Sequence, residues 1–379
     1  MKRRWPDEGT LRFVEWHARL IPDPVCRLRY LRQALEPDSA ARTRPRRARA
    51  WKRVAVLIGS LLALPAPPSA HRETVPGGKV SVRPAQPAPA PPTVWLVERN
   101  EDFELYSNGL RVENLFSVPG QPRGYWLVPC PAAGPGPLRW ATEPAGIVFH
   151  STESHLAEFE PEKTAAVRRA GLSLLEYVRR HRSYHFLVDP FGRVHRIVPE
   201  SHVAHHAGWS AWSDGNWLYL GLNDSFLGVA FETRTENGLA PLTPAQVHAG
   251  RILTEMLRAR FRIPPENCVT HAQVSLNPRN RRIGYHTDWA AGFPFGELGL
   301  PDNYTRPPAA VVLFGFDYDE PLRERKQPGL WQGLEAAGQI LMQEAAARGM
   351  TLRQYRGLLS RRYRETLAAL ERGAKEKPL

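Results

Sequence analysis

Cysteine is scarce in this sequence, and its clearest hydrophobic run is short. The 379 residues include three cysteines, Cys26, Cys130 and Cys268, whose spacing matches no cysteine metal site. The run at 54–64 has eleven residues without a charge, whereas a membrane-spanning helix needs about 20 apolar residues. With 42% hydrophobic and 23% charged residues, the composition excludes a wholly disordered chain, a collagen-like repeat and a polytopic membrane protein.

The basic charge is concentrated at the two ends of the chain. Lys and Arg number 51 against 38 Asp and Glu, which gives a net charge of +13. Residues 1–53 hold 15 basic and 6 acidic side chains, and residues 320–379 hold 12 and 7. The middle, residues 54–319, has 24 basic and 25 acidic side chains. A nucleic-acid binder that uses the basic tails is one hypothesis, but the neutral middle argues against it, and we expect no nucleic-acid partner.

The N-terminal part predicts export. An Arg-rich region, 1–53, precedes the hydrophobic segment 54–70, which ends in small residues suited to cleavage. The basic flank fits the positive-inside rule, so this segment is either an export signal or an anchor that attaches the chain to a membrane through 54–64. A short buried core segment is the alternative. Residues 71–93 contain most of the nine prolines found between 65 and 93 and read as a semi-rigid linker.

From residue 94 onward, strand and helix patterns alternate. Apolar runs predict strands at 146–150, 227–232 and 268–271, and a turn at 189–192 joins two further strands, 184–188 and 194–198. Helical spacing covers 161–181, and Thr243, Pro244 and Gln246 have the pattern of a helix start. These patterns predict an α/β fold with a central mixed β-sheet flanked by helices. Residues 306–379 form a C-terminal helical extension in this interpretation, with two helices between about 330 and 372.

Histidine is the residue type that points to chemistry. Eleven of the 13 histidines lie between 150 and 286. His150 and His271 end two predicted strands, and Asp288 follows in a loop. Two imidazoles and a carboxylate would provide three ligands for a tetrahedral Zn²⁺ and leave the fourth position to water. No HExxH motif fixes this geometry, and a single histidine on a strand is more often a structural residue than a ligand.

Five stretches in the expected order resemble the zinc N-acetylmuramoyl-L-alanine amidase family, which includes phage enzymes, cell-wall recycling amidases and peptidoglycan recognition proteins. They are 147–152 (IVFHST), 183–194 (SYHFLVDPFGRV), 198–200 with 204–208 (VPE, AHHAG), 223–224 before 228–229 (ND, GV), and 270–271 leading to 286–288 (TH, HTD). The resemblance implies an amidase domain over 94–305, with its core at 145–295. It does not cover the two ends of the chain.

The resemblance implies roles for individual residues. His150, His271 and Asp288 would be the metal ligands, with Zn²⁺ as the cofactor, and Tyr184 would lie over the catalytic water. Where the family has Lys or Thr, this sequence has His286, which is assigned a catalytic role here.

Glu232 is a further catalytic candidate. The recycling enzymes carry a catalytic Glu at the position of Ala230, and Glu232 lies two residues further along the same strand face. Glu232 either replaces that Glu as general base or faces solvent.

Four residues are predicted to bind substrate: His206, Trp209, Trp212 and Asn223. The segment from 209 to 219 is rich in aromatic residues, which would stack on sugar rings or stem-peptide side chains. Burial of the tryptophans against the sheet is the alternative.

The resemblance implies that the chain hydrolyses the amide bond between N-acetylmuramic acid and L-alanine, with peptidoglycan or muropeptides as partners. The expected location is the periplasm or cell envelope. A recognition module with little or no catalytic activity is the alternative, because positions 230 and 286 depart from the family pattern. Whether Cys130 and Cys268 pair is left open by the sequence.

Overall fold

The computed structural model describes residues 93–131, 136–154, 156–235, 240–318 and 331–375, all of which belong to one compact unit, Pro84–Leu379. The predicted basic region 1–53, the hydrophobic segment 54–70 and nearly all of the linker 71–93 lie outside the described residues. No helix in the described ranges is long and apolar enough to cross a membrane.

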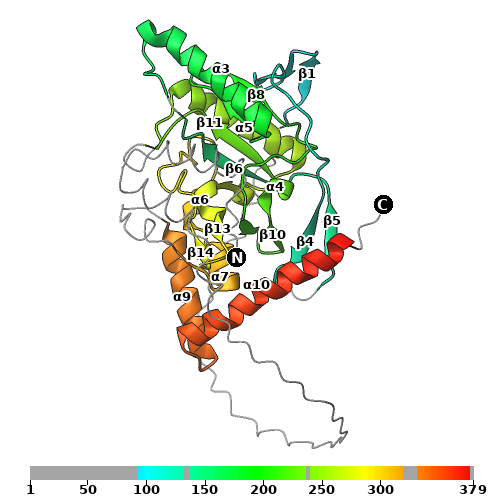
Figure 1. The fold of residues 1–379 in the computed structure, drawn as a ribbon, viewed down its shortest axis with the longest axis vertical. Helices are drawn as coiled ribbons and strands as arrows, with labels where there is room; N and C mark the ends of the chain where they lie inside the picture. The colour runs from blue at the N-terminus through cyan, green and yellow to red at the C-terminus, as the bar shows by residue number, and fades with distance from the viewer. Residues whose placement is uncertain (1–92, 132–135, 155, 236–239, 319–330, 376–379) are drawn as a thin grey trace, which may run out of the picture. The chain divides into compact units, whose positions relative to one another are not determined.

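An eight-stranded mixed sheet organises this unit (Figure 1). β6, β7, β11 and β12 form its parallel centre, and β8 pairs with β7 as an antiparallel hairpin. β1, β2 and β3 extend this side as an antiparallel meander, in which β3 runs parallel to β8. The prediction of a central mixed sheet is therefore confirmed. In spatial order the strands are β1 (Leu96–Arg99), β2 (Phe103–Tyr106), β3 (Arg111–Glu113), β8 (Val194–Arg196), β7 (Phe186–Val188), β11 (Phe226–Phe231), β6 (Gly146–Ser151) and β12 (Cys268–Thr270).

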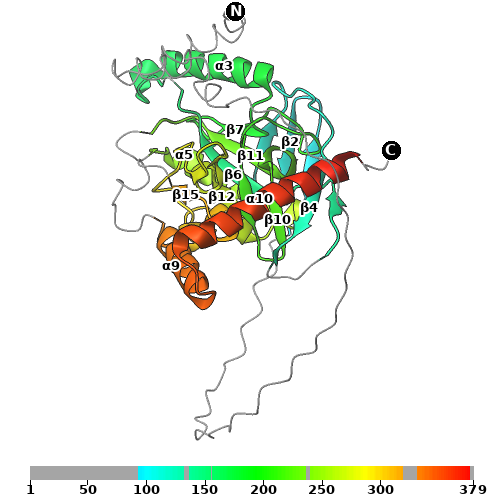
Figure 2. The ribbon, with the colours of Figure 1, turned by 60° about the horizontal axis from the view of Figure 1, so that its bottom comes forward.

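Helices cover both faces of the sheet (Figure 2). α3 (Thr164–His181) packs Leu175 and Val178 against one face, where Leu187 and Ala230 are buried. α5 (Pro244–Phe261) packs Leu253 and Met256 against the other face. Because successive strand residues point to opposite faces, Phe149 lies in the α5 core while its neighbour His150 points to the α3 face, beside Ala230.

The predicted start of the second long helix is confirmed in detail. Thr243 caps α5 by accepting a hydrogen bond from the Gln246 backbone N–H, and the Gln246 side chain accepts from the Thr243 N–H in return. This reciprocal capping box satisfies two backbone donors that a helix start leaves without partners.

A second sheet lies where the sequence pattern indicated an aromatic loop. Its four strands are β5 (Arg139–Ala141), β4 (Tyr125–Pro129), β10 (Trp217–Leu220) and β9 (Ala211–Ser213), in that order. A third, small sheet holds β13 (Leu276–Asn277), β14 (Arg282–Ile283) and β15 (Asp317–Tyr318). The short helices that connect these strands are η3 (Pro161–Lys163), α4 (Leu222–Ser225), η4 (Pro265–Asn267), α6 (His271–Val274), η5 (Asn303–Thr305) and α7 (Ala309–Phe314).

The C-terminal part contains the two predicted helices, α9 (Gln332–Ala347) and α10 (Leu352–Lys375). Leu341 of α9 and Leu359 of α10 are buried in the same hydrophobic core as the α5 face of the large sheet. α10 passes close to α7 at Gly315, where an added Cβ would lie 2.9 Å from the Arg356 Cα. The C-terminal helices thus share a core with the predicted amidase domain, and the boundary at 305 stays a prediction.

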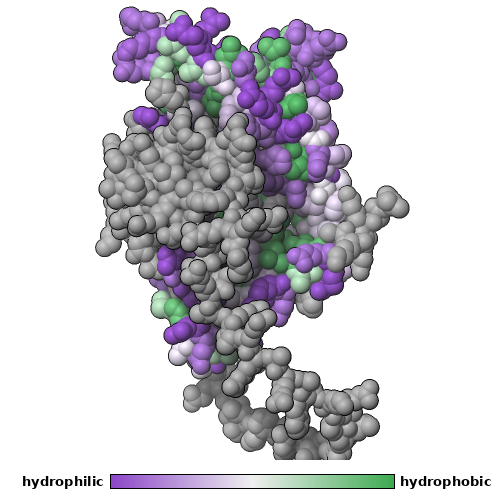
Figure 3. Space-filling model, viewed as in Figure 1, coloured by the Kyte–Doolittle hydropathy of each residue, from purple (hydrophilic) through white to green (hydrophobic). Residues whose placement is uncertain are grey.

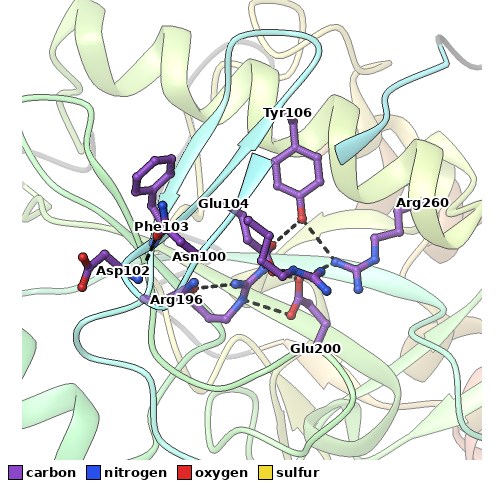
Figure 4. Close-up of polar contacts among 10 residues, drawn as sticks. Asn100, Asp102, Phe103, Glu104, Tyr106, Arg196, Glu200 and Arg260 are labelled. Carbon is purple, nitrogen blue, oxygen red and sulfur yellow. Dashed lines mark hydrogen bonds and ion pairs between the residues drawn. The ribbon is translucent and has the colours of Figure 1, made fainter. Parts of the chain in front are cut away.

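A buried ionic network fastens the meander to the rest of the sheet (Figure 4). Arg196 on β8 donates to Glu104 on β2 at 2.7 Å and to Glu200 at 3.0 Å. Arg260 on α5 also donates to Glu200, at 3.1 Å, and the Tyr106 hydroxyl donates to Glu104 at 2.6 Å. Paired in this way, the buried charges of Glu104 and Arg196 satisfy each other, as buried charges must.

Both described cysteines are free. Cys130 and Cys268 are buried and form no disulfide, which answers the question that the sequence left open.

Candidate metal centre and its surroundings

The structure brings the three predicted metal ligands together. Nδ1 of His150 lies 3.1 Å from Asp288 Oδ2, and Nδ1 of His271 lies 2.9 Å from Asp288 Oδ1. One ligand atom from each of the three residues can be chosen so that all lie within 4.8 Å of one another. The three side chains therefore converge on one point, although His150 and Asp288 are 138 positions apart in the sequence.

Strand ends position the two imidazoles. β6 and β12 are parallel neighbours, so their carboxyl ends meet at the same edge of the sheet. His150 lies near the end of β6, and His271 follows directly after β12 as the first residue of α6. Asp288 is held by its own backbone, because its carbonyl accepts a hydrogen bond from Ala272 N at 3.3 Å. Trp289, the next residue, has a φ of 55°, which turns the chain into the core immediately after the carboxylate.

Burial and mutual proximity shape the charges of the cluster. Burial, helped by the nearby His271, lowers the pKa of His150 to about 4. Burial alone would raise the pKa of Asp288, but His271 and His150 hold it well below its ordinary value. The cluster at neutral pH is therefore an ionised carboxylate beside a neutral His150 imidazole.

A chain of hydrogen bonds fixes the proton of His150. His206 Nε2 lies 3.3 Å from the Phe226 carbonyl oxygen, which can only accept, so Nε2 of His206 carries the proton. Burial lowers the pKa of His206 well below its ordinary value, so its ring is neutral and its Nδ1 must accept. His150 Nε2, 3.1 Å away, is then the donor. Nδ1 of His150 is left with a lone pair that faces the Asp288 carboxylate.

This arrangement fits a bound cation. A bare imidazole nitrogen and a carboxylate oxygen at 3.1 Å are both acceptors and repel each other unless a positive charge lies between them. His271 Nε2 is buried and has no hydrogen-bond partner among the described residues. This ring nitrogen is therefore also available to bind a metal ion. Two imidazoles and one carboxylate form the ligand set of open, hydrolytic zinc sites.

His206 and Asn223 are both predicted to bind substrate, and the structure places His206 against the candidate ligand His150 and Asn223 against the backbone of His206. The His206 ring is buried and packs over Gly228, where an added Cβ would lie 2.6 Å from its Cγ. Asn223 Oδ1 accepts hydrogen bonds from the backbone N–H of His206 and of Ala207, at 2.8 and 2.7 Å. These contacts position His150, and substrate binding by the two residues stays a prediction.

Tyr184 and His286 flank the cluster on two sides. The Tyr184 ring lies 5.1 Å from the His150 ring, and its φ of 112° is in a region that favours glycine. Such backbone strain persists only where the surrounding structure holds it, and it often accompanies function. The exposed His286 ring stacks on His271 with a centroid distance of 4.4 Å.

Glu232 does not face solvent. Its side chain is buried beneath α3, and Oε2 lies 3.1 Å from the position that a Cβ on Gly171 would take. Oε2 has no hydrogen-bond partner in the described part of the chain. Burial, with the nearby Asp189, raises the pKa of Glu232 to about 7. The solvent-facing interpretation is therefore wrong, and the general-base interpretation stays a prediction.

The two tryptophans differ. Trp209 is 65% exposed, so its ring is available to a ligand. Trp212 is 1% exposed, and its Nε1–H donates to Asn267 Oδ1 at 3.0 Å. No face of the Trp212 ring is open, and burial is the correct interpretation of this residue.

Two further residues near the centre were given no role of their own in the sequence analysis. Arg123 is buried and donates to the carbonyl oxygens of Glu200, Asp224 and His202, which ties loops around the start of β11 together. Gly228 admits the His206 ring. Only the position of Gly228, two residues before Ala230 on one strand face, could have pointed to its role.

A family model described as N-acetylmuramoyl-L-alanine amidase matches residues 140–288. The N-acetylmuramoyl-L-alanine amidase AmiD of Escherichia coli (strain K12) is 38% identical over 89 residues, which are 22% of this chain and 31% of AmiD. The chain thus spans about a third of the length of this curated relative.

Two solved structures are similar to parts of the chain. E. coli AmiD in complex with anhydro-N-acetylmuramic acid-L-Ala-D-γ-Glu-L-Lys is 28% identical with a TM-score of 0.31, over 46% of this chain and 64% of that one. AmpDh3 from Pseudomonas aeruginosa in complex with anhydromuramic pentapeptide is 23% identical with a TM-score of 0.30, over 56% and 73%. Both TM-scores are low.

Proposed function

We propose that this chain hydrolyses the amide bond between N-acetylmuramic acid and the L-alanine of the stem peptide, because residues 140–288 match the N-acetylmuramoyl-L-alanine amidase family model. The observation that carries the proposal is the convergence of His150, His271 and Asp288 on one point. A recognition module would need no such ligand set.

The proposed cofactor is Zn²⁺, held by His150, His271 and Asp288. When bound, zinc supplies a Lewis acid and a water whose pKa falls to about 7. The chain's own contribution is orientation, because the hydrogen bond from His150 Nε2 to His206 presents Nδ1 of His150 toward Asp288. Ligands held in this way need no reorganisation when the substrate arrives.

Tyr184 and His286 are the proposed catalytic residues closest to the cluster. The Tyr184 hydroxyl is protonated at neutral pH, because burial raises its pKa well above the ordinary value, so it can donate to the substrate. His286 stacks on His271 and is exposed on its other side, where it can donate a proton to the departing alanine nitrogen or hydrogen-bond the developing oxyanion.

Glu232 is proposed as the general base, and its placement makes the test decisive. Its carboxyl group lies on the same strand face as Ala230, which is paired with His150. A general base contributes about 10²–10⁴-fold in rate, so Glu232→Gln should lower kcat by that factor with little change in KM. An unchanged kcat would assign the carboxyl to the packing of α3 alone.

Metal content and muropeptide hydrolysis, measured together, test the function. His150→Ala should lose the metal and release no new N-terminal alanine from a muropeptide, while the wild type should do so until a chelator is added. His248→Ala, on the exposed side of α5, removes an imidazole far from the cluster and should change neither. If His150→Ala retains both properties, the site assignment fails.

The departures at Ala230 and His286 favour a second candidate function, a recognition module that binds peptidoglycan without cleaving it. That candidate predicts tight muropeptide binding by the metal-replete chain and no free alanine.

The proposed partners are peptidoglycan and its fragments, and the proposed location is the periplasm or cell envelope. These last proposals rest on the basic flank and hydrophobic segment at 54–70.

A further inference from the structure

A groove runs along α3 on the flank opposite the metal centre. Its volume is about 560 Å³, which is within the range of small-ligand sites. Leu172 and Leu175 of α3 form one wall, and Leu115 and Phe116, directly after β3, form the other. Leu115 is 74% exposed and Leu172 is 49% exposed. Figure 3 shows apolar patches among hydrophilic ones at the end of the molecule that carries α3.

The order of the strands separates this groove from the metal centre. β8 and β3, which contribute His195 and Glu113 to the groove, lie on one side of β7 and β11, and β6 with His150 lies on the other. His150, Ala230, Leu187 and His195 form one row across the sheet. Three strand spacings of about 4.8 Å place His195 about 14 Å from His150 along the sheet. α3 covers the row between them, through Leu175 and Val178.

A buried imidazole without a hydrogen-bond partner lies in this groove. His195 is 6% exposed, and neither ring nitrogen has a hydrogen-bond partner among the described residues. Its nearest acidic oxygen, Asp189 Oδ2, is 3.6 Å from Nε2, which is too long for a hydrogen bond. The edge of the Phe116 ring packs against it. Buried polar groups are almost always hydrogen-bonded, so this ring is suited to meet a ligand atom.

Two arginines of the groove are also available. Arg168 and Arg169 on α3 are exposed, and neither has a hydrogen bond or ion pair with another described residue. Arg193 lines the same groove but already donates to Asp189. Glu113 also lines the groove, but its carboxylate is paired with Arg111, whose Nε–H donates to Oε1 at 2.7 Å. The groove therefore offers two guanidinium groups for carboxylates, over an apolar floor.

We propose that this groove is a second peptide site, which binds a short peptide with free carboxylates and small apolar side chains. Arg168 and Arg169 bind the carboxylates, and Leu115 and Leu172 contact the apolar side chains. The identification of this peptide as a stem peptide of peptidoglycan rests on the proposed function. The site would hold a stem peptide other than the one being cleaved, because α3 separates it from the metal centre.

The mixed polarity of the groove favours a peptide over a lipid. An acyl chain would place methylenes against Arg168 and Arg169, which would remove these charges from water without a partner. A peptide with two carboxylates pairs both. Arginine binds carboxylates with two parallel hydrogen bonds, which adds geometric selectivity to the charge attraction.

Titration calorimetry with the tripeptide L-Ala-γ-D-Glu-L-Lys tests the proposal on the full-length, metal-replete chain. This probe lacks the lactyl amide and is not cleaved. We expect the wild type to bind two equivalents, one at the metal centre and one in the groove. The double variant Arg168→Glu, Arg169→Glu should lose one of them, with affinity reduced at least about tenfold per arginine, while it hydrolyses a soluble muropeptide at the wild-type rate.

The matched control is Arg179→Glu, Arg180→Glu, which makes the same charge change on α3 outside the groove. It should retain both equivalents, and an equal loss there would overturn the proposal in favour of bulk charge. If the wild type binds only one equivalent and the groove variant retains it, the proposal is overturned as well. If the groove variant loses that single equivalent, the groove site stands and the metal centre is the one that does not bind the tripeptide. Anionic phosphatidylglycerol vesicles test a lipid as the ligand. If the groove variant loses vesicle binding but binds the tripeptide as the wild type does, the peptide proposal is overturned and the groove binds a lipid surface. Calorimetry reports binding whether or not the chain hydrolyses muropeptides, so the two proposals fail separately.

Discussion

Replacing Gly228 with alanine tests whether the His206 ring controls the metal affinity of His150. The added Cβ would lie 2.6 Å from His206 Cγ and 2.9 Å from its Cδ2. Carbon atoms pack at about 3.5–4.0 Å, so the ring must move by about 1 Å. The 3.1 Å contact between His206 Nδ1 and His150 Nε2 would then lengthen beyond hydrogen-bonding range. Losing such a support typically costs about 10–100-fold in metal affinity, or roughly 1.4–2.7 kcal/mol.

Zinc competition with a chromophoric chelator measures the effect, and a thermal melt checks the fold. Gly250→Ala is the control, because its Cβ would lie 2.8 Å from Phe231 on the opposite face of the same sheet. Both variants should lose about 1–3 kcal/mol of stability to overpacking, but only Gly228→Ala should lose metal. His206→Ala should reproduce the metal loss, and the two changes together should not add. A folded Gly228→Ala variant with metal affinity within about twofold of wild type would refute the reasoning.

Three further outcomes are expected. The pKa of Glu104 is held at about 2 against an ordinary 4.5, so its charge stabilises the fold above pH 4.5 by up to roughly 3 kcal/mol. That stability is lost as the pH falls toward 2, and Glu104→Gln should flatten the acid limb of a Tm–pH curve; an unchanged limb would contradict the ionic network. The pKa of Glu232 is raised to about 7, so wild-type stability should fall as the pH rises from 4.5 to 7, and at pH 8 Glu232→Gln should be more stable by about 2–3 kcal/mol. Urea unfolding at both pH values checks this, and a variant no more stable at pH 8 would show that the carboxyl is solvated. Thr243→Ala removes the cap of α5 and should cost about 1 kcal/mol in urea unfolding, whereas no loss would mean that Gln246 alone caps the helix.

The elements and ligands that sequence patterns predicted share a local origin. The α5 start depends on Thr243, Pro244 and Gln246, which lie within one turn of helix, so the capping box was readable from four residues. The strand that carries His150 is a run of apolar residues followed by polar ones. Strand ends and a following Asp suggested the cluster, and the family resemblance was needed to assign His150, His271 and Asp288 as ligands.

The residues whose roles were left open or missed depend on contacts between distant segments. Strand periodicity placed Glu232 on the face of Ala230, but it could not tell that α3 covers that position. The same limit applies to Trp209 and Trp212, of which one is exposed and the other fully buried. His206 was predicted to bind substrate, and only the packing of its ring over Gly228 showed its contact with His150.

The sequence by itself therefore predicted five of the eight strands of the central sheet and the separation of a neutral middle from basic ends, and its motifs named the candidate ligands His150, His271 and Asp288. The strands and the charge distribution follow from period and composition, and the candidate ligands follow from the resemblance that the motifs carry. Tertiary structure alone decided the proton arrangement of His150, the burial of Glu232 and the groove beside Arg168. Each of these depends on which segment of the chain covers a given face of the sheet, because burial sets the pKa of a side chain and its hydrogen-bond partners. Sequence periodicity predicts the face on which a side chain lies, but it does not predict which distant segment packs against that face.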